Sequence, residues 1–416
     1  MAASLVVAQL KAQLASPAAD QEFALISRPN VALVYATDAY APQASALLDV
    51  LRQALPEIRH WCGTVGVGVC ASGVEYFDEP GLAVMLCEWP EDQFQVFNGI
   101  SPLGHQAPLG FKPHAALVHA DPMTPMLGEL IEDLAGLTQA GELMGGLCAS
   151  RHGPIQFAVN GWDHRPMALS HSGVFEGGLS GLALGSGVGL VCRVTQGCQP
   201  LGPKRAITRA QAHVIEALDE QAALEVLMQE LATSLDQPQQ AVAKVRQTLV
   251  GVSRPNDAAA QTWARTGSPH KAFGEEVMVR HIIGLDPARQ AVVIADEVQE
   301  GMSLSFCRRD VAAARADLRR MATEVREVVE SLEGRHSAVG EPQPSALMAS
   351  PIQGAVYVSC SGRGGPHFGA PHAELHILRE ALGDVPLVGF FAAGEIAHRQ
   401  IHGYTGVLTV FIEGEA

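Results

Sequence analysis

Val31-Ala32-Leu33-Val34-Tyr35 opens a pattern that occurs three times in this chain. The second copy opens with Ala115-Ala116-Leu117-Val118, and the third opens with Ala355-Val356-Tyr357-Val358. In each copy the apolar run is followed by a loop that carries Gly, Pro or Asp, then by an amphipathic helix, and then by a Gly-rich apolar strand that ends near a turn of small residues. Each copy spans roughly 55 to 70 residues, and a repeat of this length indicates one supersecondary element used several times.

The three expected helices share one spacing of apolar residues, which recur at i, i+3, i+4 and i+7. These positions are Ala44, Leu47, Leu48, Leu51 and Leu55 in the first copy, Met126, Leu130, Ile131, Leu134 and Leu137 in the second, and Leu375, Leu378 and Leu382 in the third. A helix with one apolar stripe lays that stripe on a sheet. We therefore predict an α+β fold of two related halves of mixed, largely antiparallel sheet, packed together with helices on the outer faces and built from repeated β-α-β-β units.

The composition is that of an acidic, folded protein. Hydrophobic residues make up 47% and charged residues 17% of the 416 residues, which is enough apolar material for two or more cores. The formal net charge is -16, and Lys and Arg form no runs, whereas binding to a nucleic-acid backbone needs clustered basic residues. We therefore expect small molecules or proteins as partners, and no nucleic acid.

The eight cysteines form no C-x-x-C pair and no framework of regular spacings. Free thiols are typical of the cytosol, so we expect a cytoplasmic protein with reduced cysteines. Residues 1–19 carry Lys11 where the apolar core of a signal peptide should be unbroken, and the apolar stretch at residues 177–194 is too rich in Gly to span a bilayer as a helix. No membrane segment is expected.

Four blocks of sequence follow one another in the order found in a known family. They are Gly197-Cys198-Gln199-Pro200-Leu201-Gly202-Pro203, then Phe306-Cys307-Arg308-Arg309-Asp310, then Ser359-Cys360-Ser361-Gly362-Arg363-Gly364, and then Gly389-Phe390-Phe391-Ala392-Ala393-Gly394-Glu395-Ile396 with His402-Gly403-Tyr404-Thr405. The first block resembles the signature that closes the N-terminal half of the FIST family, and the other three resemble its C-terminal half. The resemblance extends over about residues 30 to 412.

This resemblance implies a sensory module of signal transduction that binds a small ligand, with amino acids as the proposed ligands. It also implies an N-terminal helix and lead-in over residues 1–27, a FIST N-terminal domain over 28–224 and a FIST C-terminal domain over 225–416. The chain resembles the stand-alone bacterial form of the family. It departs from the family pattern at residues 397–401, next to Glu395, where relatives tend to carry a connection with Gly and Pro.

The loop of the third copy is the best candidate for a ligand site. Gly362, Gly364 and Gly365 allow backbone amides to turn inward, Arg363 adds a planar fork of donors, and a helix is expected to begin near Pro371. Amides, a helix N-terminus and an arginine together suit an anion, especially a carboxylate. The alternative is a structural crossover in which Arg363 forms a surface or interdomain salt bridge. On the ligand hypothesis, an Arg363→Ala variant loses binding and keeps its melting temperature.

The matching loops of the first two copies carry an acidic residue before the helix, Asp38 in one and Asp121 in the other. A short acidic side chain at that place is typical of a helix cap, so we expect both residues to cap their helices. The third loop then differs from the others because glycine and arginine have replaced the acidic cap.

The turns of small residues suggest a second pair of contacts. Arg151 follows the turn of the second copy, and Glu395 follows that of the third. Opposite charges at comparable places could hold the two ends of a zwitterion, or the two residues could pair with each other across a domain interface. With His402 from the last family block, the expected ligand-binding residues are Cys360, Gly362, Arg363, Gly364, Glu395, Arg151 and His402.

Other reactive residues point less clearly to chemistry. Cys360 could be a nucleophile activated by Arg363, but a small buried cysteine at a strand end is the commoner case. His372 and His376 lie four residues apart, but their spacing relative to Glu374 matches no zinc-protease motif. The glycines of residues 177–189 lack the setting of a dinucleotide site and are typical of closely packed strands. No metal and no cofactor are expected.

The sequence therefore predicts a cytosolic sensory protein that binds an amino acid or another small carboxylate between its two halves and passes occupancy on to a signalling partner. Two alternatives remain at this point. One is a cysteine-dependent hydrolase or transferase that uses Cys360, and the other is a protein-interaction scaffold without a ligand.

Overall fold

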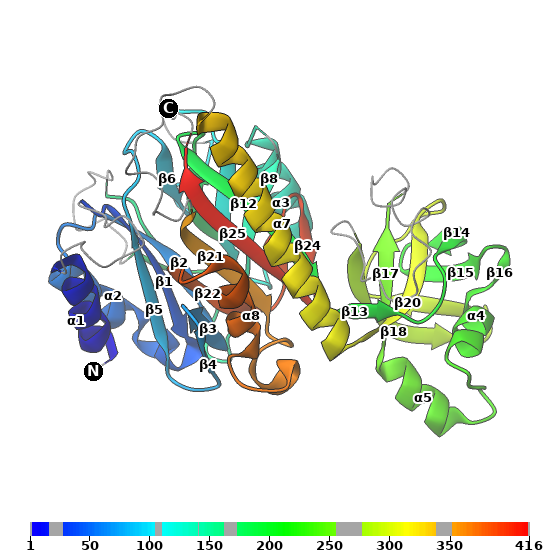
Figure 1. Ribbon diagram of the computed structural model, residues 1–416. Helices are drawn as coiled ribbons and strands as arrows, with labels where there is room; N and C mark the ends of the chain where they lie inside the picture. Colours follow the sequence, from blue (N-terminus) through cyan, green and yellow to red (C-terminus); the bar gives the residue numbers. More distant parts are fainter. Residues whose placement is uncertain are drawn as a thin grey trace. The chain divides into compact units, whose positions relative to one another are not determined.

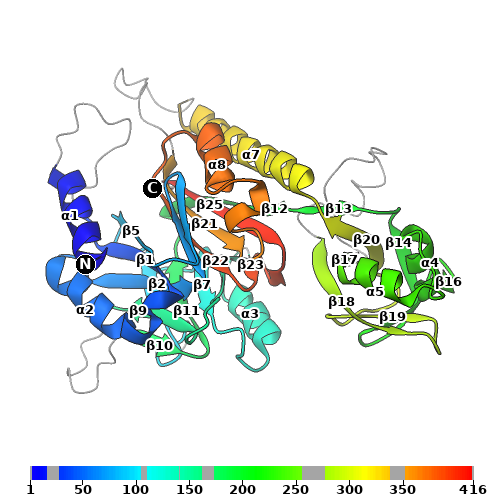
Figure 2. The same ribbon diagram turned by 90° about the horizontal axis from the view of Figure 1, so that it is seen from below.

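The computed structural model describes residues 2–15, 28–104, 110–139, 141–161, 173–254, 277–337 and 352–414. The chain forms two compact units. Unit 1 consists of residues 1–194, 319–401 and 405–416, and unit 2 consists of residues 195–318 and 402–404. The elements of both units are shown in Figures 1 and 2.

Unit 1 contains the three predicted copies, and each is built on two parallel strands joined by a helix. In the first copy β1 (Val31–Thr37) and β2 (His60–Gly66) are joined by η2 (Asp38–Gln43) and α2 (Ala44–Ala54). In the second, α3 (Leu127–Gly136) joins β7 (Ala115–Ala120) to β8 (Glu142–Leu147). In the third, η3 (Gly365–Phe368) and α8 (Ala373–Leu382) join β21 (Ile352–Cys360) to β22 (Leu387–Ala392).

An antiparallel strand completes the central part of each sheet. The three strands are β5 (Leu82–Cys87) beside β1, β11 (Leu179–Leu184) beside β7, and β25 (Thr405–Glu413) beside β21. The three sheets therefore have the same strand order at their centres, and the predicted α+β class with repeated units is confirmed.

The strand that follows each parallel pair leaves its own sheet and joins the sheet of another copy. β3 (Gly68–Ala71) follows β2 but pairs with β22 of the third copy. β9 (Ile155–Val159) follows β8 but pairs with β2, and β23 (Glu395–Ala397) follows β22 but pairs with β8. Each sheet is thus completed by a strand from a different copy.

Further strands extend the sheets at both edges. β4 (Val74–Phe77), β10 (Val174–Glu176) and β24 (Gln400–His402) follow β3, β9 and β23 at one edge, whereas β6 (Phe94–Phe97) and β12 (Val188–Gln196) lie beside β11 and β25 at the other.

Both faces of the central strands are buried, which explains their unbroken apolar sequences. Leu33, Leu117 and Val358 belong to one core cluster to which all three copies contribute. The alternate residues of β1 face a second cluster with the helices α2 and α1 (Ala2–Ala15). The helices thus lie on the outer faces of the sheets, as predicted.

A glycine occupies one equivalent place in the second strand of each pair. Gly63 pairs with Val34, Gly145 with Val118, and Gly389 with Tyr357. A Cβ atom added at these glycines would lie 1.8, 1.9 and 1.7 Å from the carbonyl oxygen of the paired residue. The Gly-rich character of these strands is therefore a requirement of close backbone approach.

We predict that Gly389→Ala lowers the free energy of unfolding by at least about 3 kcal/mol, because the new methyl group and the Tyr357 carbonyl cannot both keep their positions. The control is Gly128→Ala in α3, where a Cβ atom meets nothing within 4 Å. This change should be neutral or stabilising by up to about 1 kcal/mol, since alanine favours helix. Urea unfolding followed by circular dichroism measures both, and equal stabilities of the two variants would contradict the prediction.

The described residues of unit 2 form one eight-stranded sheet and two short helices, α4 (Ala223–Glu230) and α5 (Pro238–Arg246). Its strands are β13 (Cys198–Pro200), β14 (Arg205–Gln211), β15 (Val214–Leu218), β16 (Gln221–Ala222), β17 (Thr248–Ser253), β18 (Met278–Asp286), β19 (Ala291–Ile294) and β20 (Ser303–Arg309). Residues of α4 and of the sheet share an apolar core. The long helix α7 (Val311–Ser337) begins in unit 2 and continues into unit 1.

The compact units follow other boundaries than the predicted domains, because unit 1 takes residues from both sides of the predicted border at 224/225. The predicted domains describe relatedness to a family, and their boundaries stay a prediction.

Within the described residues, none of the helices combines the length and the apolar character needed to cross a bilayer.

Candidate functional site

Arg363 is buried at the end of β21, with a side chain that is 1% exposed. Its Nε and Nη2 atoms donate hydrogen bonds of 2.9 and 2.7 Å to Oε1 of Glu374. The guanidinium also lies over the ring of Phe368, 5.1 Å from the ring centroid. Burial works to lower the pKa of Arg363, but the adjacent Glu374 carboxylate raises it above its ordinary value, so the guanidinium stays charged.

Glu374 is the anion that Arg363 holds in this structure. It lies in the first turn of α8, and its Oε1 and Oε2 atoms accept further hydrogen bonds from the hydroxyls of Tyr357 (2.6 Å) and Ser359 (3.0 Å). The loop was predicted to bind a carboxylate, and in this structure the carboxylate that Arg363 binds is Glu374 of the same chain.

The glycines of the loop have a packing role. Gly364 lies against Phe77, since an added Cβ atom would come within 2.2 Å of that ring, and Gly365 has a positive φ of 66°. The Arg363 N–H donates to the Cys360 carbonyl at 2.7 Å and closes a tight turn around Gly362. The loop is therefore compact and places Arg363 toward the interior.

Glu395 is the second buried ionisable group of the site. It begins β23 and is fully buried, and its Oε2 atom accepts hydrogen bonds from the Thr405 N–H (3.1 Å) and hydroxyl (2.7 Å). Burial raises the pKa of Glu395 to about 8, while Thr405, Arg363 and the Cys360 side chain act to lower it. Arg363, Cys360 and Glu395 are thus close enough to interact, and Glu395 is mostly protonated at neutral pH.

Two buried polar atoms of this group have no hydrogen-bond partner within the described residues, namely Nη1 of Arg363 and Oε1 of Glu395. One is a donor on a positively charged group, and the other belongs to a carboxyl group. An unpaired buried polar atom is costly, so two of them in one interior cluster make this cluster the candidate for holding a water molecule or a small polar ligand.

Strand register shows that Glu395 is unusual among the three copies. Glu395 pairs with Gly146, the residue after the close-approach glycine of its sheet. Gln156 and Val69 hold the same place in the other two sheets, opposite Thr64 and Phe390. Only one of the three equivalent places therefore carries a carboxyl group.

Arg151 lies elsewhere in unit 1. Its Nε and Nη2 atoms donate hydrogen bonds of 2.7 and 2.8 Å to Asp38, and Nη1 donates one of 2.9 Å to Asp78. Its side chain is 56% exposed, in contrast to the buried Glu395. The structure does not bring Arg151 and Glu395 together as a described ion pair.

His402 is buried and belongs to unit 2. The assignment of Arg151 and His402 to the ligand site stays a prediction.

The prediction that Asp38 and Asp121 cap their helices is wrong. Asp38 is the first residue of η2, and its carboxylate is occupied by Arg151, whose hydrogen bonds lower the pKa of Asp38. Asp121 accepts a hydrogen bond from the Met123 N–H at 2.8 Å, which forms a turn in the loop before α3. Neither η2 nor α3 has a side-chain cap at its N-terminus.

Sequence reasoning missed Glu374 because its spacing between two histidines suggested a side chain that faces away from them. A signal for its place did exist in the strand. Tyr357 and Ser359 are two residues apart in an otherwise apolar stretch, so both project from the same face, and their hydroxyls require a buried partner.

Cys360 is 8% exposed, and all eight cysteines of the chain are free and buried. The two ionisable groups close enough to interact electrostatically with the Cys360 side chain are Arg363 and Glu395. Among the described residues no cluster of three or more His, Cys, Asp or Glu side chains could hold a metal. Nδ1 of His372 accepts a hydrogen bond from the Glu75 N–H at 3.1 Å.

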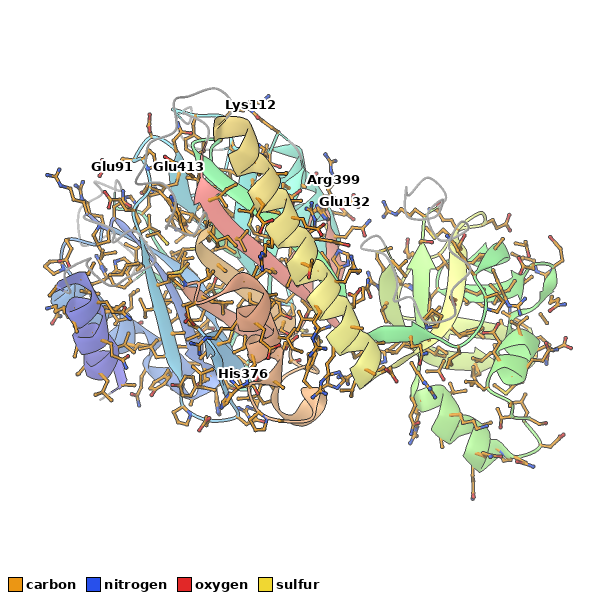
Figure 3. The ribbon with its side chains drawn as sticks, in the orientation of Figure 1. Glu91, Lys112, Glu132, His376, Arg399 and Glu413 are labelled. Atoms are coloured by element: carbon orange, nitrogen blue, oxygen red, sulfur yellow. The ribbon has the colours of Figure 1, made fainter. Side chains whose placement is uncertain are left out.

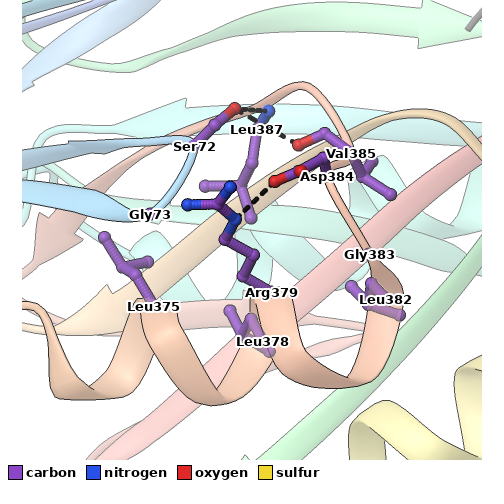
Figure 4. A pocket seen from close by; sticks show the side chains of 10 residues that line it. All are labelled: Ser72, Gly73, Leu375, Leu378, Arg379, Leu382, Gly383, Asp384, Val385 and Leu387. Carbon is purple, nitrogen blue, oxygen red and sulfur yellow. Dashed lines mark hydrogen bonds and ion pairs between the residues drawn. The ribbon is translucent and has the colours of Figure 1, made fainter. Parts of the chain in front are cut away.

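A shallow depression on the surface of unit 1 lies beside α8 and does not include the buried group (Figure 4). Its lining contains Arg379, which forms an ion pair with Asp384, and Ser72, whose hydroxyl donates to the Val385 carbonyl at 3.2 Å. Its volume of about 20 Å³ is close to the space that one water molecule needs. It is too small for an amino acid.

The model of the FIST N domain matches residues 30–221, and that of the FIST C domain matches residues 223–398. Together they cover most of the chain, so this protein belongs to the FIST family, whose members are sensory domains of signal transduction that bind small ligands.

Relatives that are similar over most of their length occur in mycobacteria. The chain is 27% identical over 402 residues to the uncharacterized protein Rv0628c of Mycobacterium tuberculosis, and the match covers 92% of each chain. It is 26% identical over 404 residues to the uncharacterized protein Mb0898c of Mycobacterium bovis, covering 92% of this chain and 91% of the relative.

We predict that Glu395→Gln changes how stability depends on pH. The wild-type carboxyl has an ordinary pKa of 4.5 and a folded pKa of about 8, so its contribution to stability is complete below pH 4.5 and is lost as pH rises to 8. Glutamine does not titrate. The variant should therefore gain about 4 kcal/mol relative to wild type between pH 5 and pH 9.

Urea unfolding at several pH values measures the difference in the free energy of unfolding between the variant and wild type. The titration of all other groups is common to both proteins and cancels in this difference. The reciprocal variant Gln156→Glu places a carboxyl at the equivalent buried position and should lose stability with rising pH in the same way. A difference between Glu395→Gln and wild type that is independent of pH would show that Glu395 is not a buried neutral acid.

Proposed function

We propose that this protein is a cytosolic sensor that binds a small zwitterion, such as an amino acid, at Arg363 and Glu395. The observation that supports this most strongly is the pair of unpartnered buried atoms, Nη1 of Arg363 and Oε1 of Glu395. A ligand carboxylate would accept from Nη1, and a ligand ammonium would donate to Oε1. Eight free, buried thiols favour a reducing compartment.

The charges of the site favour a zwitterion over a simple anion. Glu374 already neutralises Arg363, and Glu395 is mostly protonated at pH 7, so the empty site is close to neutral. A neutral ligand with separated charges satisfies both unpaired atoms and itself brings no net charge into the interior. A bare carboxylate would satisfy only Arg363.

Ligand entry requires local opening, because Arg363 and Glu395 are both buried. The elements that contact the Arg363 guanidinium are η3, through Phe368, and the first turn of α8, through Glu374. A ligand carboxylate at Arg363 would compete with Glu374 for the same guanidinium. Weakening of that ion pair would shift the first turn of α8 and provide a signal that reports occupancy.

The buried ion pair changes one expectation from the sequence. Removal of Arg363 would leave Glu374 charged and unpaired in the interior, a change that commonly costs 3–5 kcal/mol. An Arg363→Ala variant is therefore not expected to keep its melting temperature. Glu395→Gln is the better test of binding, because glutamine preserves the shape and the contact with Thr405 but cannot become negatively charged when an ammonium group binds.

We predict that amino acid binding at pH 7 releases close to one proton. With a pKa of about 8 Glu395 is mostly protonated before binding, and an adjacent ammonium group favours its carboxylate form. A carboxylate without an amine should release none, since it favours protonated Glu395. Calorimetry in buffers of different ionisation enthalpy, with the twenty amino acids and with acetate and succinate, measures this count.

The Glu395→Gln variant should bind at least about tenfold more weakly and release no proton. Glu142→Gln is the matched control, because Glu142 is a partly exposed carboxylate on β8, the strand beside β23, and should leave binding unchanged. Native mass spectrometry of protein purified from cells identifies any retained ligand. Absence of binding across the panel together with no retained small molecule would refute the proposed function.

A further inference from the structure

Three apolar side chains lie exposed on the outer side of α3 and of the loop before it. Met123 is 83% exposed, Met126 67% and Leu130 39%. Leu130 lies in the first turn of α3, and Met123 and Met126 lie in the segment just before the helix, so the three side chains belong to one short stretch of chain. Methionine at such a position is typical of surfaces that adapt to a helical partner.

The first copy shows what covers the equivalent surface there. Leu47 is the fourth residue of α2, as Leu130 is of α3, yet Leu47 is only 8% exposed. Leu47 shares a core cluster with Val7 and Leu10 of α1, the helix that lies against α2 (Figures 1 and 2). The second copy presents the same kind of apolar surface without a described helix of this chain over it.

The loop before α3 is held in a defined conformation. Oδ1 of Asp121 accepts from the Met123 N–H at 2.8 Å, and the Thr124 hydroxyl oxygen accepts from the Gly178 N–H at 3.1 Å. Met126 has a left-handed backbone conformation with φ of 55°. The methionines are therefore presented by an ordered segment, which lowers the entropy cost of binding.

The segment that carries the three exposed apolar side chains is acidic. Residues 115–150 contain no Lys and no Arg. Glu129 and Asp133 are exposed on α3, and Glu132, on the same helix, is labelled in Figure 3. A partner that covers the apolar stripe must also face these carboxylates, so basic side chains are favoured at its edges.

We propose that the α3 surface, made of Met123, Met126, Leu130, Glu129 and Asp133, binds an amphipathic helix of a partner protein that carries Lys or Arg beside an apolar stripe. The partner helix occupies the place over α3 that α1 occupies over α2. Its apolar residues pack on the methionines, and its basic residues face Glu129 and Asp133. This surface is independent of the ligand site and offers a route by which a sensor engages its signalling partner.

The test uses the full-length protein and a synthetic helical peptide of about 18 residues, with Leu at i, i+3, i+4 and i+7 and Lys elsewhere. Two companion peptides serve as comparisons, one with Glu in place of Lys and one with the same composition in an order that destroys the stripe. Fluorescence anisotropy should give a Kd of about 10 µM or tighter for the basic amphipathic peptide at physiological salt, and much weaker binding for both companions. Methionine-methyl NMR should show the largest shifts at Met123 and Met126.

Combined Met123→Ser, Met126→Ser and Leu130→Ser changes should weaken binding at least about tenfold, whereas Val50→Ser should change it less than about twofold. Val50 is the control because it is an exposed apolar residue of α2, the equivalent helix. The proposal would be overturned if the scrambled peptide bound equally well, or if the two sets of variants had equal effects. Either result would show that the peptide is attracted generally to an acidic protein. Sedimentation that shows dimers broken by the α3 changes would also overturn it, since a second copy would then be the occupant.

Discussion

The exchange of strands among the three sheets of unit 1 is the constraint on which the rest of that unit depends. β3, β9 and β23 each follow a parallel pair in one copy and form backbone hydrogen bonds in the sheet of another. No copy has a complete sheet of its own, and the shared core cluster takes residues from all three. This arrangement joins segments that are distant in the sequence through many backbone hydrogen bonds. Buried backbone N–H and C=O groups must form such bonds. It also determines which side chains meet in the interior.

The candidate site follows from this exchange. Arg363 ends β21 in the sheet of the third copy, while Glu395 lies on β23, which has crossed to the sheet of the second copy. The crossing brings a carboxyl group beside a guanidinium that already has a carboxylate partner. The other two crossings place Gln156 and Val69 at the same position, so the framework itself does not require an acid there. A buried carboxyl that is half satisfied lowers stability, which is the reason for our proposal that Glu395 serves a function.

The sequence was informative where structure is local. The apolar runs, the helical spacing and the glycine-rich strands predicted the three copies, because each of these patterns is set by neighbours within a few residues. It was uninformative about partners across sheets. Nothing in a short turn tells whether the next strand stays beside the last one, so Arg151 was matched with Glu395 although register makes Gln156 the counterpart of Glu395. Arg363 was singled out as the cation for a ligand carboxylate, but the separation of eleven residues between Arg363 and Glu374 concealed that the chain itself supplies a carboxylate to this guanidinium.

The central claim is that Glu395 is a neutral acid, buried beside Arg363 and available to a ligand. Carbon-13 NMR of the side-chain carboxyl carbons in glutamate-labelled protein tests it most directly, with the Glu395 signal assigned by its loss in Glu395→Gln. The account predicts an apparent pKa of about 8 for this group in the protein without ligand. Titration of Glu395 near 4.5, the ordinary value for glutamate, would contradict it.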